Sequence, residues 1–403
     1  MKAGIATARA DVLLYVQHLL GIGHLRRAAV LSQALTAAGL RVVFVTGGRP
    51  APEVNIVASE LVQLPPARVV DESFALVDDA GAPTTPAWEA ARCAQLLDTF
   101  RRCRPRCLLI ELFPFGRRQM RFELLPLLTL AQETRPRPWI VTSQRDVLNR
   151  PGKPEKVRWI LSIFERYFDL AIVHGDPKVI TLEQSFPDVA PFAARLRYSG
   201  YVVQPSASSS GGAAAGLGDG VGAGEVLVSI GGGAVGAPLV AAALAARPLS
   251  RAADAPWRFL LGHNLPEEDF RRFQAAAGDG VIVERARPDF PARLANCRLS
   301  ISQAGYNTVM EILSAGAAAV VVPFAAGSET EQSLRANLLA ERGLLTLLAE
   351  AALTPENLAQ AVDDSLARRL EGRAPRPQLD LDGAAKTATI LQEIMASEAG
   401  APS

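Results

Sequence analysis

Short apolar runs alternate with amphipathic segments along the first half of the chain. The runs have the length of buried β-strands, and the segments between them repeat apolar residues at helical spacing. Strands that alternate with helices predict a parallel sheet with helices on both faces. The expected strands are residues 11–17, 41–46, 61–64, 107–112, 139–143 and 170–174. The expected helices are residues 25–38, 88–103, 118–133 (with Pro126 inside) and 155–167.

The pattern stops and then restarts after a stretch rich in Ser, Gly and Ala. Residues 204–224 have the composition of a flexible linker. Beyond it, further strands are expected at residues 225–230, 258–262, 281–283, 298–302, 318–324 and 345–348, and helices from residues 238, 306, 354 and 383. We therefore predict an N-terminal domain (1–203), the linker (204–224), a second α/β domain (225–378) and a C-terminal helical segment (379–403).

Composition sets broad limits without choosing a function. The chain has 403 residues, 49% hydrophobic and 21% charged, with a formal net charge of +1. This is ordinary for a globular protein and gives no indication of nucleic-acid binding. Lys and Arg outnumber Asp and Glu by 26 to 19 through residue 200 and are outnumbered by 22 to 16 beyond it. The basic half suits an anionic partner or a membrane surface, or it is an Arg-rich solvated face.

The cysteines and histidines do not form a disulfide or metal-binding pattern. Cys93, Cys103 and Cys107 fall in or beside one expected helix, Cys297 is far away, and no histidine stands at metal-ligand spacing from them. The Asp-x-Asp at residues 380–382 lies outside any expected strand end and is expected to be solvated. There is no convincing signal peptide and no apolar run of about 20 residues. These features predict a cytoplasmic protein without a cofactor or metal, which can still contact the inner face of a membrane peripherally.

One stretch, residues 299–332, combines a strand, a tight turn, a helix and a second strand. Its turn contains Gln303 and Gly305, its helix begins at residues 306–308, and Glu311 follows one turn later. Polar groups at strand ends and the free N–H groups of a helix N-terminus suit a diphosphate, and Glu311 can reach a ribose diol. The alternative is an ordinary βαβ unit with a capped helix and no ligand.

The order of polar residues in this stretch resembles the donor-site signature of GT-B glycosyltransferases, most of all family 28. The matching residues are Gln303, Gly305, Asn307, Thr308, Glu311, Gly316, Pro323, Glu331 and Gln332. The resemblance implies that residues 303–308 hold the diphosphate of a sugar nucleotide, Glu311 the ribose, and Glu331 with Gln332 the sugar. Many family members have His where this chain has Gln303, which can donate to a phosphate oxygen but carries no charge.

A glycine-rich loop, residues 21–27, joins the first expected strand to the first helix. Gly21 and Gly23 allow the backbone to approach a bound group closely. His24 stands at the helix N-terminus, where the positive end of the dipole lowers the pKa of an imidazole, and a neutral imidazole can act as a general base. Family 28 enzymes carry a similar loop, so the resemblance covers this site too. His18 is the second candidate, and a purely structural histidine is the alternative.

Further polar residues at predicted strand ends are candidates for ligand binding. The candidates on the acceptor side are Gly21, Gly23 and Arg26 in the glycine-rich loop, Glu111 and Arg117 after one strand, and Arg145 after the next. Arg26 and its neighbour Arg27 either hold phosphate or face solvent. Phe113 and Phe115 could grip an anionic or lipid-linked acceptor together with these charges. The alternative is a loop with solvated charges and two core phenylalanines.

Two segments of the second domain complete the candidate donor site. Gly231, Gly232 and Gly233 follow a strand and precede a helix, which makes a phosphate-binding nest, although glycine runs also occur as plain turns. The segment 284–290 also follows a strand. In relatives this segment holds the nucleotide base, so the resemblance implies that Arg287 or its neighbours contact the base, with uracil favoured.

The combined interpretation is a GT-B fold: two doubly wound Rossmann-like domains facing a cleft, with the last helix crossing back onto the first domain. The implied reaction is inverting, metal-independent transfer of N-acetylglucosamine or another hexose from a nucleotide diphosphate sugar, UDP-linked by resemblance, to an unknown acceptor that is lipid-linked or a polysaccharide. His24 is the expected base. A nucleotide-sugar hydrolase and a non-catalytic sugar-nucleotide-binding protein are the alternatives. A metal-free epimerase would need paired acid and base carboxylates, which the sequence does not offer.

Overall fold

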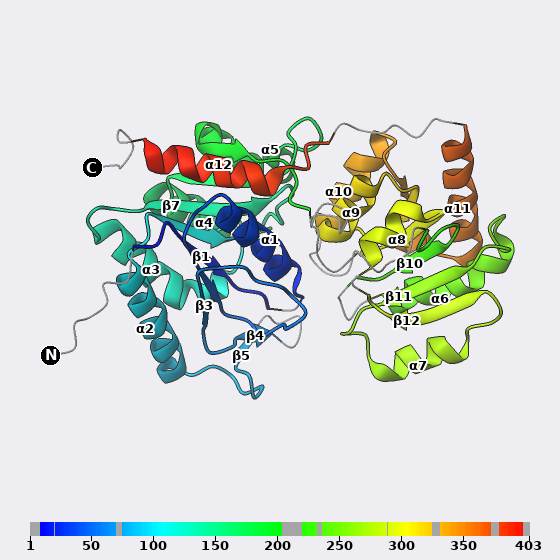
Figure 1. The fold of residues 1–403 in the computed structure, drawn as a ribbon, viewed down its shortest axis with the longest axis horizontal. Helices are drawn as coiled ribbons and strands as arrows, with labels where there is room; N and C mark the ends of the chain where they lie inside the picture. The colour runs from blue at the N-terminus through cyan, green and yellow to red at the C-terminus, as the bar shows by residue number, and fades with distance from the viewer. Residues whose placement is uncertain are drawn as a thin grey trace. The chain divides into compact units, whose positions relative to one another are not determined.

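The chain folds as two compact units, each a parallel sheet between layers of helices (Figure 1). Unit 1 is residues 1–202 together with 380–403, and unit 2 is residues 203–379. The computed structural model describes residues 9–19, 21–69, 75–203, 220–231, 236–287, 289–324, 331–371 and 379–397. The α/β class with two Rossmann-like domains that the sequence predicts is confirmed.

Unit 1 is built on a seven-stranded sheet in which every paired strand runs parallel to its neighbour. The strand order is β3-β2-β1-β6-β7-β8-β9. The chain passes from β1 outward to β2 and β3 and then returns to the other side of β1 at β6. β1 and β6 therefore flank a topological switch point, where ligands of open α/β sheets bind beyond the strand ends. The bounds are β1 Val12–Val16, β2 Val42–Thr46, β3 Glu60–Gln63, β6 Cys107–Glu111, β7 Trp139–Arg145, β8 Leu170–His174 and β9 Leu196–Tyr198.

Helices cover both faces of this sheet because alternate residues of its strands are apolar on each side. One face packs against α2, α3 and α4, and the other packs against α1 and α12. The bounds are α1 Gly23–Ala37, α2 Pro86–Cys103, α3 Arg121–Glu133, α4 Pro154–Tyr167, α5 Leu182–Ser185 and α12 Gly383–Ala396. A two-stranded hairpin (β4 Arg68–Val69, β5 Leu76–Val77) and the 3-10 segments Arg118–Met120 and Pro187–Arg195 complete unit 1.

The last helix packs within unit 1 although it follows unit 2 in the sequence. α12, red in Figure 1, lies beside α1. Ala388 and Leu391 of α12 belong to the same buried apolar cluster as Leu31 and Leu35 of α1. At its end, the carbonyl of Met395 accepts a hydrogen bond of 2.8 Å from the Arg106 guanidinium.

The segment that leads into α12 is tied to unit 1 through backbone bonds. The N–H of Tyr201 donates to the carbonyl of Asp380 at 2.7 Å, and Val202 forms a β-bridge with Asp382. The N–H of Asp380 donates to the carboxylate of Asp176 at 3.2 Å. The expectation that the Asp-x-Asp is simply solvated is therefore wrong for Asp380, which is half-buried at this junction.

Unit 2 repeats the doubly wound plan with six parallel strands. The order β12-β11-β10-β13-β14-β15 places the switch point between β10 and β13. One face of the sheet buries the side chains of alternate residues, including Trp257 and Phe259, against α6 and α11. The strands are β10 Val226–Ser229, β11 Trp257–Leu261, β12 Val281–Arg285, β13 Leu299–Ser302, β14 Ala319–Val321 and β15 Thr346–Leu347. The helices are α6 Ala237–Ala246, α7 Glu267–Ala275, α8 Phe290–Asn296, α9 Tyr306–Ala315, α10 Glu331–Glu341 and α11 Pro355–Leu370, with 3-10 segments Arg247–Leu249 and Glu350–Ala352.

Local sequence signals fix several helix ends. Thr85 and Thr354 cap α2 and α11 by accepting hydrogen bonds from backbone N–H groups, and a proline follows each cap. Gly316 ends α9 with a left-handed backbone, φ +63°, which glycine adopts without steric cost. The start of α11 agrees with the predicted start within one residue, whereas α2 begins at Pro86, before its predicted start at residue 88.

The linker region differs in part from the prediction, and the shortest elements of unit 1 are not predicted. Residues 204–219 lie outside the described residues. Residues 220–224, predicted as the end of the linker, form turns against α8, where the amide of Asn296 donates to the carbonyl of Val221 at 3.1 Å. The short elements at 182–198, which include β9, were not predicted, because two prolines interrupt any regular pattern there.

Candidate functional site

The switch point of unit 1 brings the predicted base together with a buried carboxylate. α1 begins at Gly23, so His24 lies in the first turn after the loop that follows β1. Glu111 is the last residue of β6, the strand beside β1. Nδ1 of His24 lies 2.8 Å from Oε1 of Glu111, and both side chains are buried. Glu111, predicted on the acceptor side, is 2% exposed and is therefore a partner of His24 instead.

The second ring nitrogen of His24 faces an arginine. The guanidinium of Arg145, at the end of β7, contacts Nε2 of His24. Because a guanidinium has only hydrogen-bond donors, Nε2 must be the acceptor and Nδ1 must carry the hydrogen donated to Glu111. Burial, followed by the charges of Arg145 and Arg117, lowers the pKa of His24 well below its ordinary value. The direction agrees with the prediction, but burial and arginines are the causes found here.

Glu111 is held from three directions. Its Oε1 also contacts the guanidinium of Arg27, and its Oε2 accepts a hydrogen bond of 2.7 Å from the hydroxyl of Ser143. Arg27 is 3% exposed, so neither predicted role, phosphate binding or a solvent-facing charge, describes it. Arg26 is exposed. The carboxylate is thus fixed with one oxygen toward His24.

The hydrogen bonds continue from Ser143 across the next two strands. Oγ of Ser143 lies 2.8 Å from Nε2 of His174, the last residue of β8, and Nδ1 of His174 lies 2.9 Å from Oγ of Ser199. All three side chains are buried. We call this set the Glu111 chain; it consists of Arg145, His24, Glu111, Arg27, Ser143, His174 and Ser199.

The loop after β6 positions Arg117 with an unusual backbone. Leu112 and Arg117 both have left-handed φ angles, +67° and +58°, which are uncommon outside glycine. Nε of Arg117 donates to the carbonyl of Gln17 at 2.6 Å. Burial and the charge of Arg145 lower the pKa of Arg117 to about 10, so it stays charged at neutral pH.

The two phenylalanines of this loop do not face a ligand. Phe113 and Phe115 are buried in the core of unit 1. Phe113 meets Trp159 edge to face with ring centroids 6.0 Å apart. The prediction that these aromatic rings grip an acceptor is therefore wrong, and the core alternative is confirmed.

His18, the second candidate base, lies at the end of β1 and is buried against Gly48. A Cβ at Gly48 would fall 2.3 Å from the His18 ring, so this position requires glycine. Burial lowers the pKa of His18, and its Nδ1 is buried without a hydrogen-bond partner. Unlike His24, His18 is not paired with a carboxylate in the described residues.

The switch point of unit 2 brings two predicted donor-site motifs together. The loop after β10 begins with Gly231, whose φ of +64° is left-handed, and the turn after β13 leads into α9. A Cβ at Gly231 would lie 3.9 Å from Oγ1 of Thr308, in the first turn of α9. Gly232 and Gly233 lie outside the described residues.

Among the described residues, no atom approaches the Cβ position of Gly305 at the start of α9, where a diphosphate is expected. Gly305 is the N-cap of α9, with φ −63° and no side-chain cap, and a Cβ built on it meets no atom within 4 Å. Backbone strain therefore does not explain this glycine, and a ligand approaching the helix N-terminus would. Gly21 in unit 1 is similarly open.

The remaining predicted residues of α9 lie along its first turns. Asn307 and Thr308 belong to the first turn, and Glu311, three residues after Thr308, lies on the same side of the helix. Gln303 directly follows β13. All four side chains are half-buried, which leaves part of each accessible.

Glu331 and Gln332 are the first two residues of α10. Glu331 is paired with Arg335 one turn later, with N and O 2.9 Å apart, and Oε1 of Gln332 accepts from the N–H of Phe324 at 3.2 Å. Arg335, which the sequence analysis missed, is fully buried and donates to the carbonyl of Ala304 at 3.2 Å. Arg335 thus joins the start of α10 to the turn before α9.

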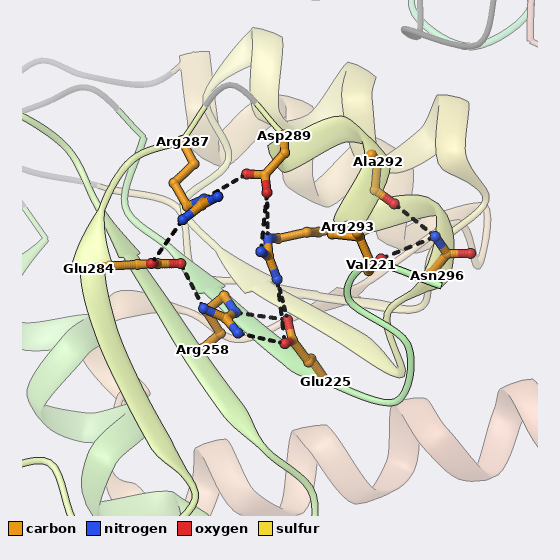
Figure 2. Close-up of polar contacts among 9 residues, drawn as sticks. All are labelled: Val221, Glu225, Arg258, Glu284, Arg287, Asp289, Ala292, Arg293 and Asn296. Atoms are coloured by element: carbon orange, nitrogen blue, oxygen red, sulfur yellow. Dashed lines mark hydrogen bonds and ion pairs between the residues drawn. The ribbon is translucent and has the colours of Figure 1, made fainter. Parts of the chain in front are cut away.

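Arg287, the predicted contact to the nucleotide base, belongs to a ring of ion pairs. This ring lies on the face of the unit 2 sheet opposite the one that packs against α6 and α11. Figure 2 shows three arginines alternating with three carboxylates. We call it the arginine–carboxylate ring; its members in order are Glu225, Arg258, Glu284, Arg287, Asp289 and Arg293. The shortest N–O distance in each of its six links is between 2.8 and 3.3 Å. Arg287 is the most exposed member, with 43% of its side chain accessible.

No described helix is both long enough and apolar enough to cross a membrane. No group of three or more His, Cys, Asp or Glu side chains in the described ranges is arranged to hold a metal ion.

Comparisons with known proteins agree with this geometry. Residues 227–389 match the model of the glycosyltransferase family 28 C-terminal domain. The UDP-N-acetylglucosamine--N-acetylmuramyl-(pentapeptide) pyrophosphoryl-undecaprenol N-acetylglucosamine transferase of Methylorubrum extorquens is 31% identical over 120 residues. That match spans 30% of this chain and 31% of the relative, so it covers about a third of the relative's length.

Solved structures extend the likeness to the whole fold. MurG of Acinetobacter baumannii aligns with a TM-score of 0.62 and 16% identity, over 95% of this chain and 99% of that one. A putative UDP-N-acetylglucosamine 2-epimerase of Listeria monocytogenes also aligns with a TM-score of 0.62, at 13% identity and 95% coverage of both chains. At these identities the likeness establishes the fold alone. The chain thus has the GT-B fold and is family 28-like: residues 227–389 resemble the glycosyltransferase family 28 C-terminal domain, as the signature from Gln303 to Gln332 predicts.

Proposed function

We propose that the protein is an inverting, metal-independent glycosyltransferase that uses a nucleotide diphosphate sugar. The observation that carries this proposal is the pairing of His24 with Glu111, which fixes a neutral imidazole with its hydrogen on Nδ1 and its lone pair on Nε2. A lone pair of this kind is what a general base needs at neutral pH. The family 28 domain in unit 2 supports the donor class.

In the proposed reaction, an acceptor hydroxyl takes the place of Arg145 at Nε2 of His24. The hydroxyl oxygen attacks the anomeric carbon of the donor sugar, and its proton passes to Nε2. The bond from the anomeric carbon to the diphosphate oxygen breaks, and the nucleoside diphosphate leaves with the electron pair. A single displacement inverts the anomeric centre. Glu111 stabilises the imidazolium that forms, because its carboxylate accepts the Nδ1 hydrogen.

The leaving diphosphate needs donors that compensate its charge. We assign this role to the backbone N–H groups at the start of α9, the hydroxyl of Thr308, the amide groups of Asn307 and Gln303, and the N–H groups after Gly231. Glu311 would bind the ribose. Glu331 and Gln332 would bind the sugar, and Arg335 holds Glu331 in place.

The nature of the donor and acceptor is inferred from the relatives. The Methylorubrum enzyme is named for UDP-N-acetylglucosamine and a pyrophosphoryl-undecaprenol acceptor. We propose a UDP-sugar donor and an acceptor with an anionic group, lipid-linked or polysaccharide, because Arg117 and Arg145 supply positive charge beside His24. We also propose that the protein works in the cytoplasm, in peripheral contact with the membrane when its acceptor is lipid-linked.

The first test is calorimetric titration with UDP, GDP, dTDP and CDP without metal. Micromolar binding of UDP alone is expected. Binding of another nucleotide would change the donor, and binding of none would overturn the assignment of unit 2. Glu311→Ala is expected to weaken binding, whereas Glu341→Ala, at the far end of α10, serves as the matched control.

The second test follows release of UDP from UDP-N-acetylglucosamine with and without the lipid acceptor named for the relative. His24→Ala should reduce acceptor-dependent release by about 10²- to 10⁴-fold while leaving UDP affinity unchanged. The exposed His263→Ala is the control. Release of free sugar without acceptor would favour a hydrolase, and binding without turnover would favour a non-catalytic protein.

A further inference from the structure

We infer that Ser143 and His174 are positioning residues, which orient Glu111 and thereby set the tautomer of His24. This inference rests on the proposed role of His24 as the base. It concerns two side chains that touch neither the proposed substrate nor the reacting atoms. They act through the carboxylate of Glu111, which accepts from Ser143 at Oε2 and from His24 at Oε1.

The directions of the hydrogen bonds follow from the number of hydrogens available. Ser143 has one hydroxyl hydrogen and donates it to Oε2 of Glu111 at 2.7 Å. Its oxygen therefore accepts from Nε2–H of His174, 2.8 Å away. Nδ1 of neutral His174 then accepts from the hydroxyl of Ser199 at 2.9 Å, in competition with the carbonyl of Gly200 at 3.0 Å. Each group from Ser199 through His174 and Ser143 therefore donates its hydrogen to the next group, and Glu111 is the final acceptor.

Ser143 and His174 are buried, so the directions of their hydrogen bonds are fixed by protein groups and not by water. Ser143 is 1% exposed and His174 is 0% exposed, so water cannot replace a lost partner without a change in packing. Burial and the charge of Arg27 lower the pKa of His174 well below its ordinary value, which keeps it neutral and leaves one ring hydrogen to place. With Oε2 occupied by Ser143, Oε1 is the oxygen left for His24.

The charged and titratable groups around both histidines come from several elements. Those facing His24 are Glu111 at the end of β6, Arg145 at the end of β7, Arg117 in the loop after β6, Arg27 on α1 and His18 after β1. Those facing His174 are Arg27 directly and Glu111 through Ser143. Ser143 and the neutral His174 can both be changed without removing a charge.

The test is nitrogen-15 NMR of the side chains of the four histidines in the full-length protein, recorded as a function of pH. In the wild type, His24 is expected as the Nδ1–H tautomer. In Ser143→Ala, Glu111 loses the donor that fixes its orientation and compensates part of its negative charge. The titration midpoint of His24 should then rise by about one pH unit, and the Nδ1–H signal should broaden or lose population.

Matched variants separate positioning from packing. Ser143→Thr keeps the hydroxyl and His174→Gln keeps a donor near the position of Nε2, so both should retain the wild-type His24 signal. His174→Phe removes the donor and should resemble Ser143→Ala. Backbone amide spectra verify that each variant is folded, and Ser199→Ala offers a milder change if one is not.

The outcomes are distinct from those of the transfer assay. If Ser143→Ala and His174→Phe leave the His24 titration and tautomer as in the wild type, the inference is overturned even when transfer is intact. The same holds if wild-type His24 is the Nε2–H tautomer, or if Ser143→Thr is as altered as Ser143→Ala. If the NMR expectations hold but no sugar is transferred, the proposed function fails and the positioning of His24 stands.

Discussion

The Glu111 chain of unit 1 and the arginine–carboxylate ring of unit 2 are both polar networks beside a parallel sheet, but they are built differently, and the ring is only partly buried. The ring closes on itself, with each carboxylate contacting two arginines. The Glu111 chain runs across the ends of neighbouring strands and carries two neutral histidines. At the end of the Glu111 chain that is farthest from Ser199, His24 contacts Arg145.

This difference in construction suggests different roles: the ring stabilises the fold, whereas the Glu111 chain can take up a proton. In the ring, burial raises the pKa of Glu225, but hydrogen bonds and charges from Arg258 and Arg293 lower it on balance. The ring therefore holds its charges and its geometry together. In the Glu111 chain, burial favours neutral imidazoles instead, so protons can still be taken up there. A polar network that keeps proton-accepting capacity at a strand end is suited to catalysis.

Removing the charge of Glu111 should have the largest effect. Glu111→Gln deletes the anion that Arg27 and His24 contact, and loss of one partner of a buried ion pair costs about 3 kcal/mol. The free energy of unfolding of unit 1, measured by hydrogen exchange and mass spectrometry, should fall by that amount, and transfer should be lost. Glu60→Gln, which breaks only a partly exposed pair with Arg102, is the control. An unchanged unit 1 would show that Glu111 is not held as a charge.

Opening the ring should cost less, because each carboxylate keeps another arginine. Arg293→Met removes the links to Glu225 and Asp289, while Arg258 and Arg287 still contact them. We expect a loss of about 2 kcal/mol in unit 2 by hydrogen exchange and no change in His24. Arg271→Met, which breaks an exposed pair on α7, should have no measurable effect. Equal effects of the two variants would show that the ring contributes no stability.

The two networks should respond to pH in different ranges. The pKa values of His24 and His174 are lowered by burial in the folded state, so below about pH 6.5 the unfolded chain binds protons that the folded chain does not. The unfolding free energy of unit 1 should therefore fall with falling pH, by about 1.4 kcal/mol per pH unit for each histidine, until their folded pKa values are reached.

The carboxylates of the ring respond to falling pH in the same direction, but in a more acidic range, because their ordinary pKa values are near 4. The pKa values of Glu225 and Asp289 are lowered on balance by their arginines, against burial, so their stabilisation is present at neutral pH and is lost as pH falls through those lowered values. Unit 2 should keep its stability between pH 7.5 and 5.5. A steeper pH dependence in unit 2 than in unit 1 over this range would contradict the comparison.

The smallest effect on stability is expected at Gly305. Gly305→Ala adds a methyl group to open space at φ −63°. The loss of a good N-cap and the reduced entropy of the unfolded chain nearly cancel, within about 0.5 kcal/mol. Nucleotide affinity, measured by calorimetry, should nevertheless fall at least about tenfold if a diphosphate occupies this space. Unchanged affinity would place the diphosphate elsewhere.

Most of the fold could be predicted because its signals are local. The apolar runs and the caps each act within a few residues, and they predict most strands and the helices α1 to α4, α6, α9, α11 and α12 near their observed bounds, but not α7 or α8. β9 and its neighbours were missed because short segments broken by proline have no period to detect. α10 is not predicted, because Glu331 and Gln332 are interpreted as part of a ligand motif and not as the start of a helix.

The candidate sites were only partly predictable, because their partners come from distant parts of the sequence. His24 was found from its glycine-rich loop, but Ser143 and His174 look like ordinary strand residues in isolation. One signal was available: Glu111, Ser143 and His174 all stand near the carboxyl ends of successive strands. A second available signal concerns the ring: Arg258 is a charged residue inside a strand of a parallel sheet, and such strands are usually apolar on both faces.

The placement of α12 has a consequence for how the protein is made. Unit 1 needs both the first and the last segments of the chain, and α12 supplies Ala388 and Leu391 to the apolar cluster that also contains α1. During translation, the sheet of unit 1 therefore emerges long before the helix that covers part of it, and the whole of unit 2 is synthesised in between. The nascent chain must keep the apolar side of α1 from aggregating during that interval, so completion of unit 1 is a late event in its biosynthesis.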